Sequence, residues 1–179
     1  VHPNDHVNMA QSTNDVYPTA GKLTILALLP AALHQLNRLY EALEIKAQEF
    51  DDVVKMGRTQ LQDAVPIRLG QEFHAYASAI QRDIKRLHKA AKDMCVVNMG
   101  ATAIGTAINV SADYLDHIVA DLREITKFPL IQSENLIDGT QNLDGFVNVS
   151  GIIKTCAVNL SKMSNDLRLM SSGPRTGLA

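Results

Sequence analysis

Apolar residues recur along most of the chain at alternating spacings of three and four, the period of one face of an α-helix. The first predicted helix runs from Asp15 to Phe50. Its apolar stripe comprises Leu26, Leu29, Leu33, Leu36, Tyr40, Leu43, Ala47 and Phe50. Pro18 suits the first turn, whereas Pro30 lies inside the pattern and predicts a kink near Leu26. At about 1.5 Å per residue, this helix would be about 50 Å long.

Two further long helices are predicted, over residues 68–98 and 140–170. Their stripes comprise Leu69, Phe73, Tyr76, Ile80, Ile84, Leu87, Ala91 and Met94, and Phe146, Val149, Ile153, Cys156, Leu160, Met163, Leu167 and Met170. A shorter helix should begin behind Ser111, an N-cap candidate, and end by Lys127. Helices average about 11 to 12 residues in ordinary domains, so this pattern predicts an all-α bundle of long antiparallel helices. Heptad seams of this kind also favour assembly into a symmetric oligomer.

Two tracts without a helical period separate the predicted helices. Residues 56–67 contain Pro66 and many hydrogen-bonding side chains, which is typical of a connecting loop and also compatible with a binding site. Residues 100–107 are small, apolar and spaced by glycines. We expect the second tract to be a loop that allows a close backbone approach.

Composition narrows the function classes. The 179 residues are 46% hydrophobic, enough for one domain with a core, and the net charge of −2 with a pI near 6.3 argues against nucleic-acid or membrane-surface binding. No uninterrupted apolar run reaches membrane-spanning length, so we expect no membrane partner. Cys95 and Cys156 lie within apolar stripes. We interpret them as reduced core thiols, and we expect a cytoplasmic protein.

The opening residues 1–15 are densely polar, with two histidines, three asparagines and two aspartates before the first helix. Backbone N–H groups at a helix entrance lack intrahelical partners and attract anions. Ser12, Thr13 and Asn14 add side-chain donors there, although such residues often serve only as caps. His2, Asp5 and His6 lie close in sequence, but no predicted helix places them and carboxylates are few. We therefore assign no metal site.

The remaining charged residues suggest no chemistry of their own. Four histidines lie within helical patterns and are interpreted as surface or satisfied interior groups, namely His34, His74, His88 and His117. A basic run is interrupted by Asp83 and Asp93, which predicts a solvated helix face. The run comprises Arg82, Lys85, Arg86, Lys89 and Lys92.

Four tracts resemble the aspartase/fumarase superfamily. The tract from His2 to Pro18 is similar to its histidine-proline-asparagine-aspartate-histidine-valine-asparagine signature, and residues 57–64 are similar to its second conserved segment. Residues 98–108 and 134–142 resemble two less specific segments, although Asn142 stands where the family usually has aspartate. Thr13 and Gln60 look like the aspartate ammonia-lyase branch, because class II fumarases usually have serine and histidine there.

The resemblance implies an elimination that converts L-aspartate to fumarate and ammonia without a cofactor. A general base removes a proton next to the β-carboxylate and creates an aci-carboxylate, whose charge the site must stabilise. Ser12, Thr13 and Asn14 would hold the substrate, while Thr59 and Gln60 would bind its β-carboxylate or α-amino side. His2, Asn4 and Asp5 would line a second anion site. The family's sites combine three subunits of a homotetramer.

The resemblance also implies that residues 1–179 form the central helical domain of a longer protein. The general-base serine would then lie on a loop beyond Ala179 and another domain would precede Val1, so we expect no catalytic residue and no lyase activity in residues 1–179 alone. Class II fumarase, the argininosuccinate and adenylosuccinate relatives, and a non-catalytic helical scaffold remain alternatives. The polar density of residues 2–15 and 57–63 favours an enzyme over a scaffold.

Overall fold

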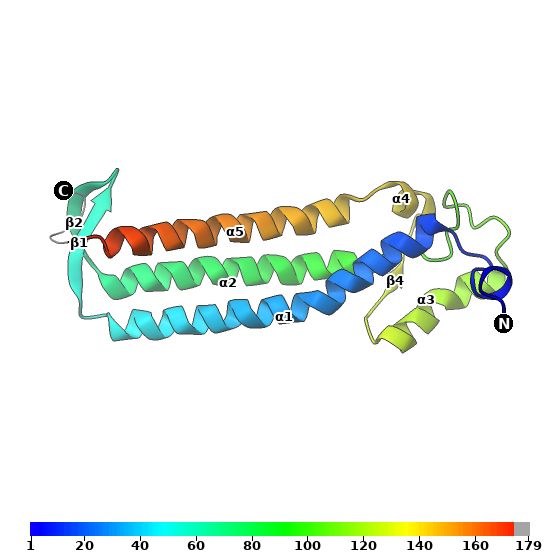
Figure 1. Cartoon of the computed structure of the whole chain (residues 1–179), viewed down its shortest axis with the longest axis horizontal. Helices are drawn as coiled ribbons and strands as arrows, with labels where there is room; N and C mark the ends of the chain where they lie inside the picture. The colour runs from blue at the N-terminus through cyan, green and yellow to red at the C-terminus, as the bar shows by residue number, and fades with distance from the viewer. Residues whose placement is uncertain (174–179) are drawn as a thin grey trace. The chain divides into compact units, whose positions relative to one another are not determined.

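The computed structural model describes residues 1–173, which form two compact units. The first unit contains residues 1–30 and 88–150, and the second contains residues 31–87 and the chain from Gly151 onward. Three long helices contribute to both units: α1 (Thr13–Glu49), α2 (Leu69–Met94) and α5 (Asp144–Met170) (Figure 1). The predicted all-α class is confirmed. Pro174, part of the predicted stop after the last helix, lies outside the described residues.

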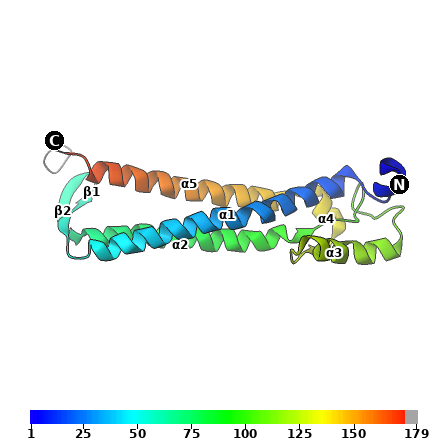
Figure 2. The same cartoon turned by 60° about the horizontal axis from the view of Figure 1, so that its bottom comes forward.

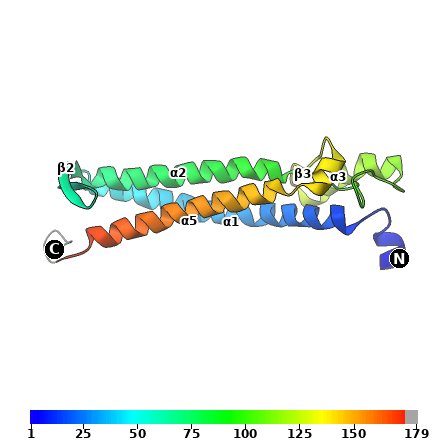
Figure 3. The ribbon, with the colours of Figure 1, turned by 90° about the horizontal axis from the view of Figure 1, so that it is seen from above.

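The apolar stripes supply the cores of both units. Buried apolar residues of the second unit include Leu33, Leu43, Ala47, Tyr76, Ala77, Ile80, Ile84, Leu87, Cys156 and Met163. Those of the first unit include Leu26, Ala90, Met94, Val97, Met99, Ala101, Val119, Leu130 and Val149. Within the second unit, α2 and α5 lie side by side in both views (Figures 1 and 3).

Gly70 allows α2 to begin directly against the end of α1. A Cβ atom at this position would lie 2.3 Å from the carbonyl oxygen of Ala47 and 2.9 Å from the Cα of Asp51, so no larger residue fits. The rings of Phe50 and Phe73 pack beside this contact, with centroids 5.5 Å apart. The predicted stripe therefore holds α1 and α2 together within the second unit.

The ends of two predicted helices were wrong. α2 stops at Met94 because residues 96–97 form strand β3 (Val96–Val97), which pairs in parallel with β4 (Ile131–Gln132). The predicted helix over residues 140–170 is divided into α4 (Leu136–Gln141) and α5. Asn142 separates them in an extended conformation, with φ −109° and ψ 139°. In both cases pairing or backbone geometry at the helix end prevailed over the apolar period.

The short helix α3 (Ala112–Thr126) follows its prediction closely. The hydroxyl of Ser111 accepts a hydrogen bond from the backbone N–H of Tyr114 at 3.2 Å, which confirms the predicted N-cap. Lys127 adopts a left-handed conformation with φ 60°, which ends the helix before Pro129.

The tract over residues 56–67 is not the irregular loop that we predicted. It forms an antiparallel hairpin of β1 (Val54–Thr59) and β2 (Gln62–Arg68), which lies between α1 and α2 along the chain (Figure 2). Gln60 and Leu61 form its turn, with φ values of 49° and 63°. Most hairpin residues are exposed, so the apolar and polar alternation that reveals a half-buried strand is missing.

Asp83 corrects the interpretation of the basic run. Its neighbours in the run are exposed, but the side chain of Asp83 is completely buried in the second unit. Its carboxylate accepts hydrogen bonds from Asn159 Nδ2 at 2.8 Å and from Arg86 Nη1 at 2.6 Å. The residue belongs to the core side of α2.

Polar residues interrupt the apolar run of α1, so the sequence pattern did not predict a membrane span. By length and composition alone, however, this helix is long and apolar enough to cross a membrane. This is weak evidence for a membrane helix, because core helices of soluble proteins meet the same criterion. In this helix Leu26, Leu33, Leu43 and Ala47 are buried within the two units.

Candidate functional site

The entrance of α1 is built by a reciprocal cap. The hydroxyl of Ser12 accepts a hydrogen bond from the backbone N–H of Asn14 at 3.2 Å. In return, Asp15 Oδ1 accepts the backbone N–H of Ser12 at 2.9 Å. This is the capping-box arrangement, with aspartate at the third helical position, and it fixes residues 12–15 against one another.

The glycine-spaced loop docks on this entrance (Figures 1 and 2). Asp15 Oδ2 accepts the backbone N–H groups of Gly100 at 3.2 Å and Thr102 at 3.0 Å. Asn14 Nδ2 donates to the carbonyl oxygen of Ala103 at 2.6 Å. The first and third tracts of the resemblance, far apart in sequence, therefore meet in the first unit.

The fourth tract joins the same cluster. Asn98 Nδ2 donates to the carbonyl oxygen of Asn14 and to the hydroxyl of Thr140, each at 3.1 Å. Gly105 has φ 89°, and a Cβ atom there would lie 2.4 Å from the Cα of Ile137, so the loop needs glycine where it passes α4. Residues 98–107 are thus held between the entrance of α1 and α4.

The side chains expected to bind substrate are accessible. Thr13 and Asn14 are exposed and Ser12 is half-buried, whereas Asp15 beneath them is completely buried. The positive end of the α1 dipole favours an anion at this position. Burial, and then the charge of Asp15, raise the pKa of Tyr114 above its ordinary value, so its phenol stays neutral.

The proposed second anion site lies on a single turn of π-helix, η1 (Pro3–Val7). His2, Asn4 and Asp5 are exposed. The backbone N–H of Asp5 donates to His2 Nδ1 at 3.3 Å, and Asp5 Oδ2 lies 3.1 Å from the same nitrogen. Across residues 1–173, no group of three or more histidine, cysteine, aspartate or glutamate side chains is arranged to hold a metal ion.

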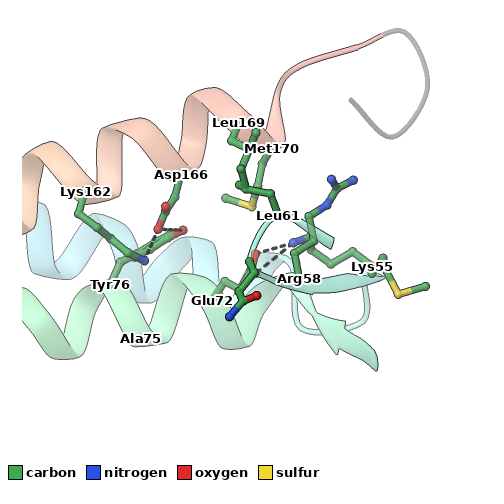
Figure 4. A pocket seen from close by; sticks show the side chains of 12 residues that line it. Lys55, Arg58, Leu61, Glu72, Ala75, Tyr76, Lys162, Asp166, Leu169 and Met170 are labelled. Carbon is green, nitrogen blue, oxygen red and sulfur yellow. Dashed lines mark hydrogen bonds and ion pairs between the residues drawn. The ribbon is translucent and has the colours of Figure 1, made fainter. Parts of the chain in front are cut away.

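Thr59 and Gln60 lie at the turn of the hairpin, in the second unit. Gln60 lines a cavity of about 580 Å³ between the hairpin, the start of α2 and the end of α5, together with Lys55, Arg58, Leu61, Glu72, Tyr76, Lys162 and Asp166 (Figure 4). Lys55 pairs with Glu72 at 2.9 Å, and Lys162 pairs with Asp166. The lining of the cavity therefore carries charges of both signs in addition to Gln60.

Tyr76 is tied to the same cavity. Its hydroxyl donates to Asp166 Oδ2 at 3.1 Å. Burial is the largest cause that raises the Tyr76 pKa far above its ordinary value, and the charge of Asp166 and this hydrogen bond add to it. The phenol is therefore a hydrogen-bond donor throughout the neutral pH range.

The predicted site residues divide between the units. Ser12, Thr13 and Asn14 gather in the first unit with the loop of residues 98–107, and Thr59 and Gln60 lie together in the second. Sequence reasoning missed Asp15 and Asn98, which hold the first group in place. A signal for Asp15 was present: an acidic residue three positions after the N-cap serine is typical of a capping box.

Comparison with known proteins finds lyases both among sequence families and among individual relatives. The sequence profile of a family described as "Lyase" matches residues 1–179. Aspartate ammonia-lyase from Bacillus subtilis (strain 168) is 52% identical over 99% of this chain and 37% of its own length. Aspartate ammonia-lyase from Escherichia coli (strain K12) is 48% identical, with the same two shares.

Solved structures agree with the fold. A fumarate lyase (delta crystallin) from Brucella melitensis, bound to cobalt, is 50% identical with a TM-score of 0.96 over 99% of this chain and 39% of that one. A class II fumarase from Schistosoma mansoni is 36% identical with a TM-score of 0.91, over 99% of this chain and 40% of that one. The chain thus spans about 37–40% of the length of these relatives.

Proposed function

The chain belongs to the lyase family of the aspartase/fumarase superfamily, and on this premise we propose that the whole protein is an aspartate ammonia-lyase, converting L-aspartate to fumarate and ammonia. One contrast carries the proposal. Identity to aspartate ammonia-lyases is 48–52% over nearly the whole chain, against 36% to the class II fumarase structure. Thr13 and Gln60 favour the same branch.

The geometry supports binding of a dicarboxylate at two places. At the α1 entrance, Ser12, Thr13 and Asn14 would hold one end of the substrate at the positive end of the α1 dipole. Thr59 and Gln60, presented by the hairpin turn, would bind the β-carboxylate or the α-amino side. Donors held rigidly around the developing aci-carboxylate would stabilise its charge without rearranging during the reaction.

The proposal extends to parts of the protein beyond residues 1–179. These residues would form the central helical domain, and the general-base serine would lie on a loop after Ala179, as the family resemblance implies. The active protein would be a cytoplasmic homotetramer whose sites combine residues from three copies. We therefore expect residues 1–179 alone, purified and folded, to show no ammonia release from L-aspartate above background.

The test uses the full-length protein with L-aspartate and, separately, L-malate, with fumarate formation followed by ultraviolet absorbance. Fumarate from aspartate alone is expected. Fumarate from malate alone would refute the ammonia-lyase and support the fumarase alternative, which the structural likeness to the Schistosoma mansoni enzyme favours. No product from either substrate would leave the other lyases of the superfamily and the scaffold alternative.

The variant Gln60→His sharpens the same experiment, because it places the residue usual in class II fumarases at the hairpin turn. We expect aspartate turnover to fall by about 100-fold, the scale of one lost donor. Leu61→His, which puts the same side chain at the neighbouring turn position, is the matched control. Equal losses in both variants would mean that Gln60 has no role of its own.

A further inference from the structure

One carboxylate links the α1 entrance to the loop of residues 98–107. Asp15 is 0% exposed, and its two oxygens accept three backbone N–H groups. Oδ1 accepts from Ser12 at 2.9 Å, and Oδ2 accepts from Gly100 at 3.2 Å and Thr102 at 3.0 Å. The first contact lies within the α1 cap and the other two reach across 85 or more positions in sequence.

Only a carboxylate satisfies this arrangement. Burying a charge is costly unless hydrogen bonds and opposite charge compensate it, and here three N–H donors and the positive end of α1 do so. An asparagine of the same shape has one acceptor oxygen and an NH₂ group that would face an N–H donor. It could hold the cap or the loop, but not both.

The loop in turn orients a substrate-binding candidate. Asn14 Nδ2 donates to the Ala103 carbonyl at 2.6 Å, so the position of the loop decides where the Asn14 amide points. The buried hydroxyl of Thr102 has no hydrogen-bond partner among the described residues. The hydrogen bond that ties Thr102 to α1 is therefore the one from its backbone N–H to Asp15.

We propose that Asp15 is a positioning residue for the elimination. It touches no substrate, but it locks residues 12–14 and residues 100–103 into one rigid cradle for the substrate carboxylate. The inference rests on the proposed function, because it concerns the same site. Its loss should displace Asn14 and the first-turn N–H groups together.

The experiment compares the full-length wild type with Asp15→Asn and with Asp83→Asn. Asp83 is the matched control, because it is completely buried like Asp15 but lies in the second unit. Its carboxylate accepts a hydrogen bond from the side chain of Asn159. Hydrogen exchange measured by mass spectrometry reports on the loop. Binding of succinate, a dicarboxylate with no amino group to eliminate, reports on the cradle independently of turnover.

In the wild type without ligand, we expect the Gly100 and Thr102 amides to be protected from exchange. Asp15→Asn should exchange faster at residues 99–104, bind succinate at least about tenfold more weakly, and lose about 100-fold in kcat on L-aspartate, as misplaced binding groups do. Asp83→Asn should lose stability, with succinate affinity and kcat within about twofold of wild type, because the hydrogen-bond partners of Asp83, Arg86 and Asn159, are not those of Asp15.

Several outcomes would overturn the proposal. Rapid exchange of the Gly100 and Thr102 amides in the wild type would show that Asp15 does not hold the loop. This test does not depend on whether Asp15→Asn folds. If Asp15→Asn loosens the loop but keeps the same succinate affinity and kcat as Asp83→Asn, Asp15 is a purely structural residue. If the wild type turns over no aspartate but binds succinate, and Asp15→Asn weakens that binding, the proposed activity fails and only the positioning of the carboxylate-binding residues by Asp15 stands. If succinate does not bind at all, both fail.

Discussion

At the scale of single residues, buried polar groups distinguish the two units. Asp15 and Asp83 are both completely buried, but the first is compensated by backbone N–H groups and the second by the side chains of Asn159 and Arg86. A buried acceptor that loses its donor retains the full cost of desolvation. Each aspartate therefore makes its partners important for stability.

Asn159→Ala should lower the free energy of unfolding by about 1–3 kcal/mol, because it removes a hydrogen bond from a buried carboxylate. Urea denaturation measures the change. Asn148→Ala is the matched control on the same helix, since its amide donates to Asp93 at an exposed position and should cost less than about 0.5 kcal/mol. Similar losses in both variants would contradict the importance of the buried pair.

Tyr76 predicts a specific pH dependence. Burial and Asp166 raise its pKa in the folded state, so the stability it contributes is fully present below the unfolded pKa of about 10 and is lost as pH rises toward the folded value. The stability difference between wild type and Tyr76→Phe should therefore shrink above pH ~10. Urea unfolding from neutral to alkaline pH measures it.

Tyr17→Phe, at an exposed tyrosine, is the control for this pH series. The stability difference of Tyr76→Phe should change more with pH than that of this control. If the two variants show the same pH dependence, the Tyr76 phenol does not interact with Asp166 as the geometry indicates.

At the scale of elements, the hairpin turn is a strained connection that bears on the site. Gln60 and Leu61 both have positive φ, which suits a tight hairpin turn but costs a residue with a side chain about 1 kcal/mol or more. Such strain often accompanies function, and Gln60 is the residue that the proposed activity requires. Leu61 lines the same cavity, but its exposed side chain is apolar and offers no hydrogen-bond donor to a substrate.

Leu61→Gly and Gln60→Gly should each raise the free energy of unfolding by about 0.5–1 kcal/mol, because glycine relieves the same backbone strain at both positions. Only Gln60→Gly should lose activity on L-aspartate, by about 100-fold, since it removes a binding side chain. Thermal unfolding and steady-state kinetics of the full-length protein measure the two effects. An equal loss of activity in both variants would show that hairpin rigidity, not the amide, is needed.

At the scale of the whole molecule, the apolar seam of α5 is only partly buried in a single chain. Val149, Cys156 and Met163 are buried, but Ile153 is 54% and Leu167 is 37% exposed. A heptad seam with alternate positions exposed is consistent with packing against further helices. This observation supports the proposed homotetramer.

Ile153→Glu should shift full-length protein from four copies to smaller species, because a buried charge at an apolar helix interface is costly. Light scattering after size-exclusion chromatography measures the mass. Lys154→Glu introduces the same side chain one position away, at an exposed polar residue, and should leave the mass unchanged. A monomeric wild type, or dissociation by both variants, would argue against this seam as an interface.

The sequence by itself determined the helices and the residues that line them. The apolar period placed α1 and α3 to within two residues and most buried positions of α2, because burial of a helix face is a local, repeating requirement. It also singled out Ser12, Thr13, Asn14, Thr59 and Gln60, whose roles stay predictions.

Only the tertiary structure decided the elements and contacts that depend on distant partners. The β3–β4 pair shortened α2, and the exposed hairpin carried no alternating pattern by which it could be recognised. Asp83 looked like part of a charged surface until Asn159 was brought to it across 76 positions. Likewise, only the structure shows that Asp15 binds the loop of residues 98–107. A hydrogen bond between segments far apart in sequence leaves no periodic signal in either one.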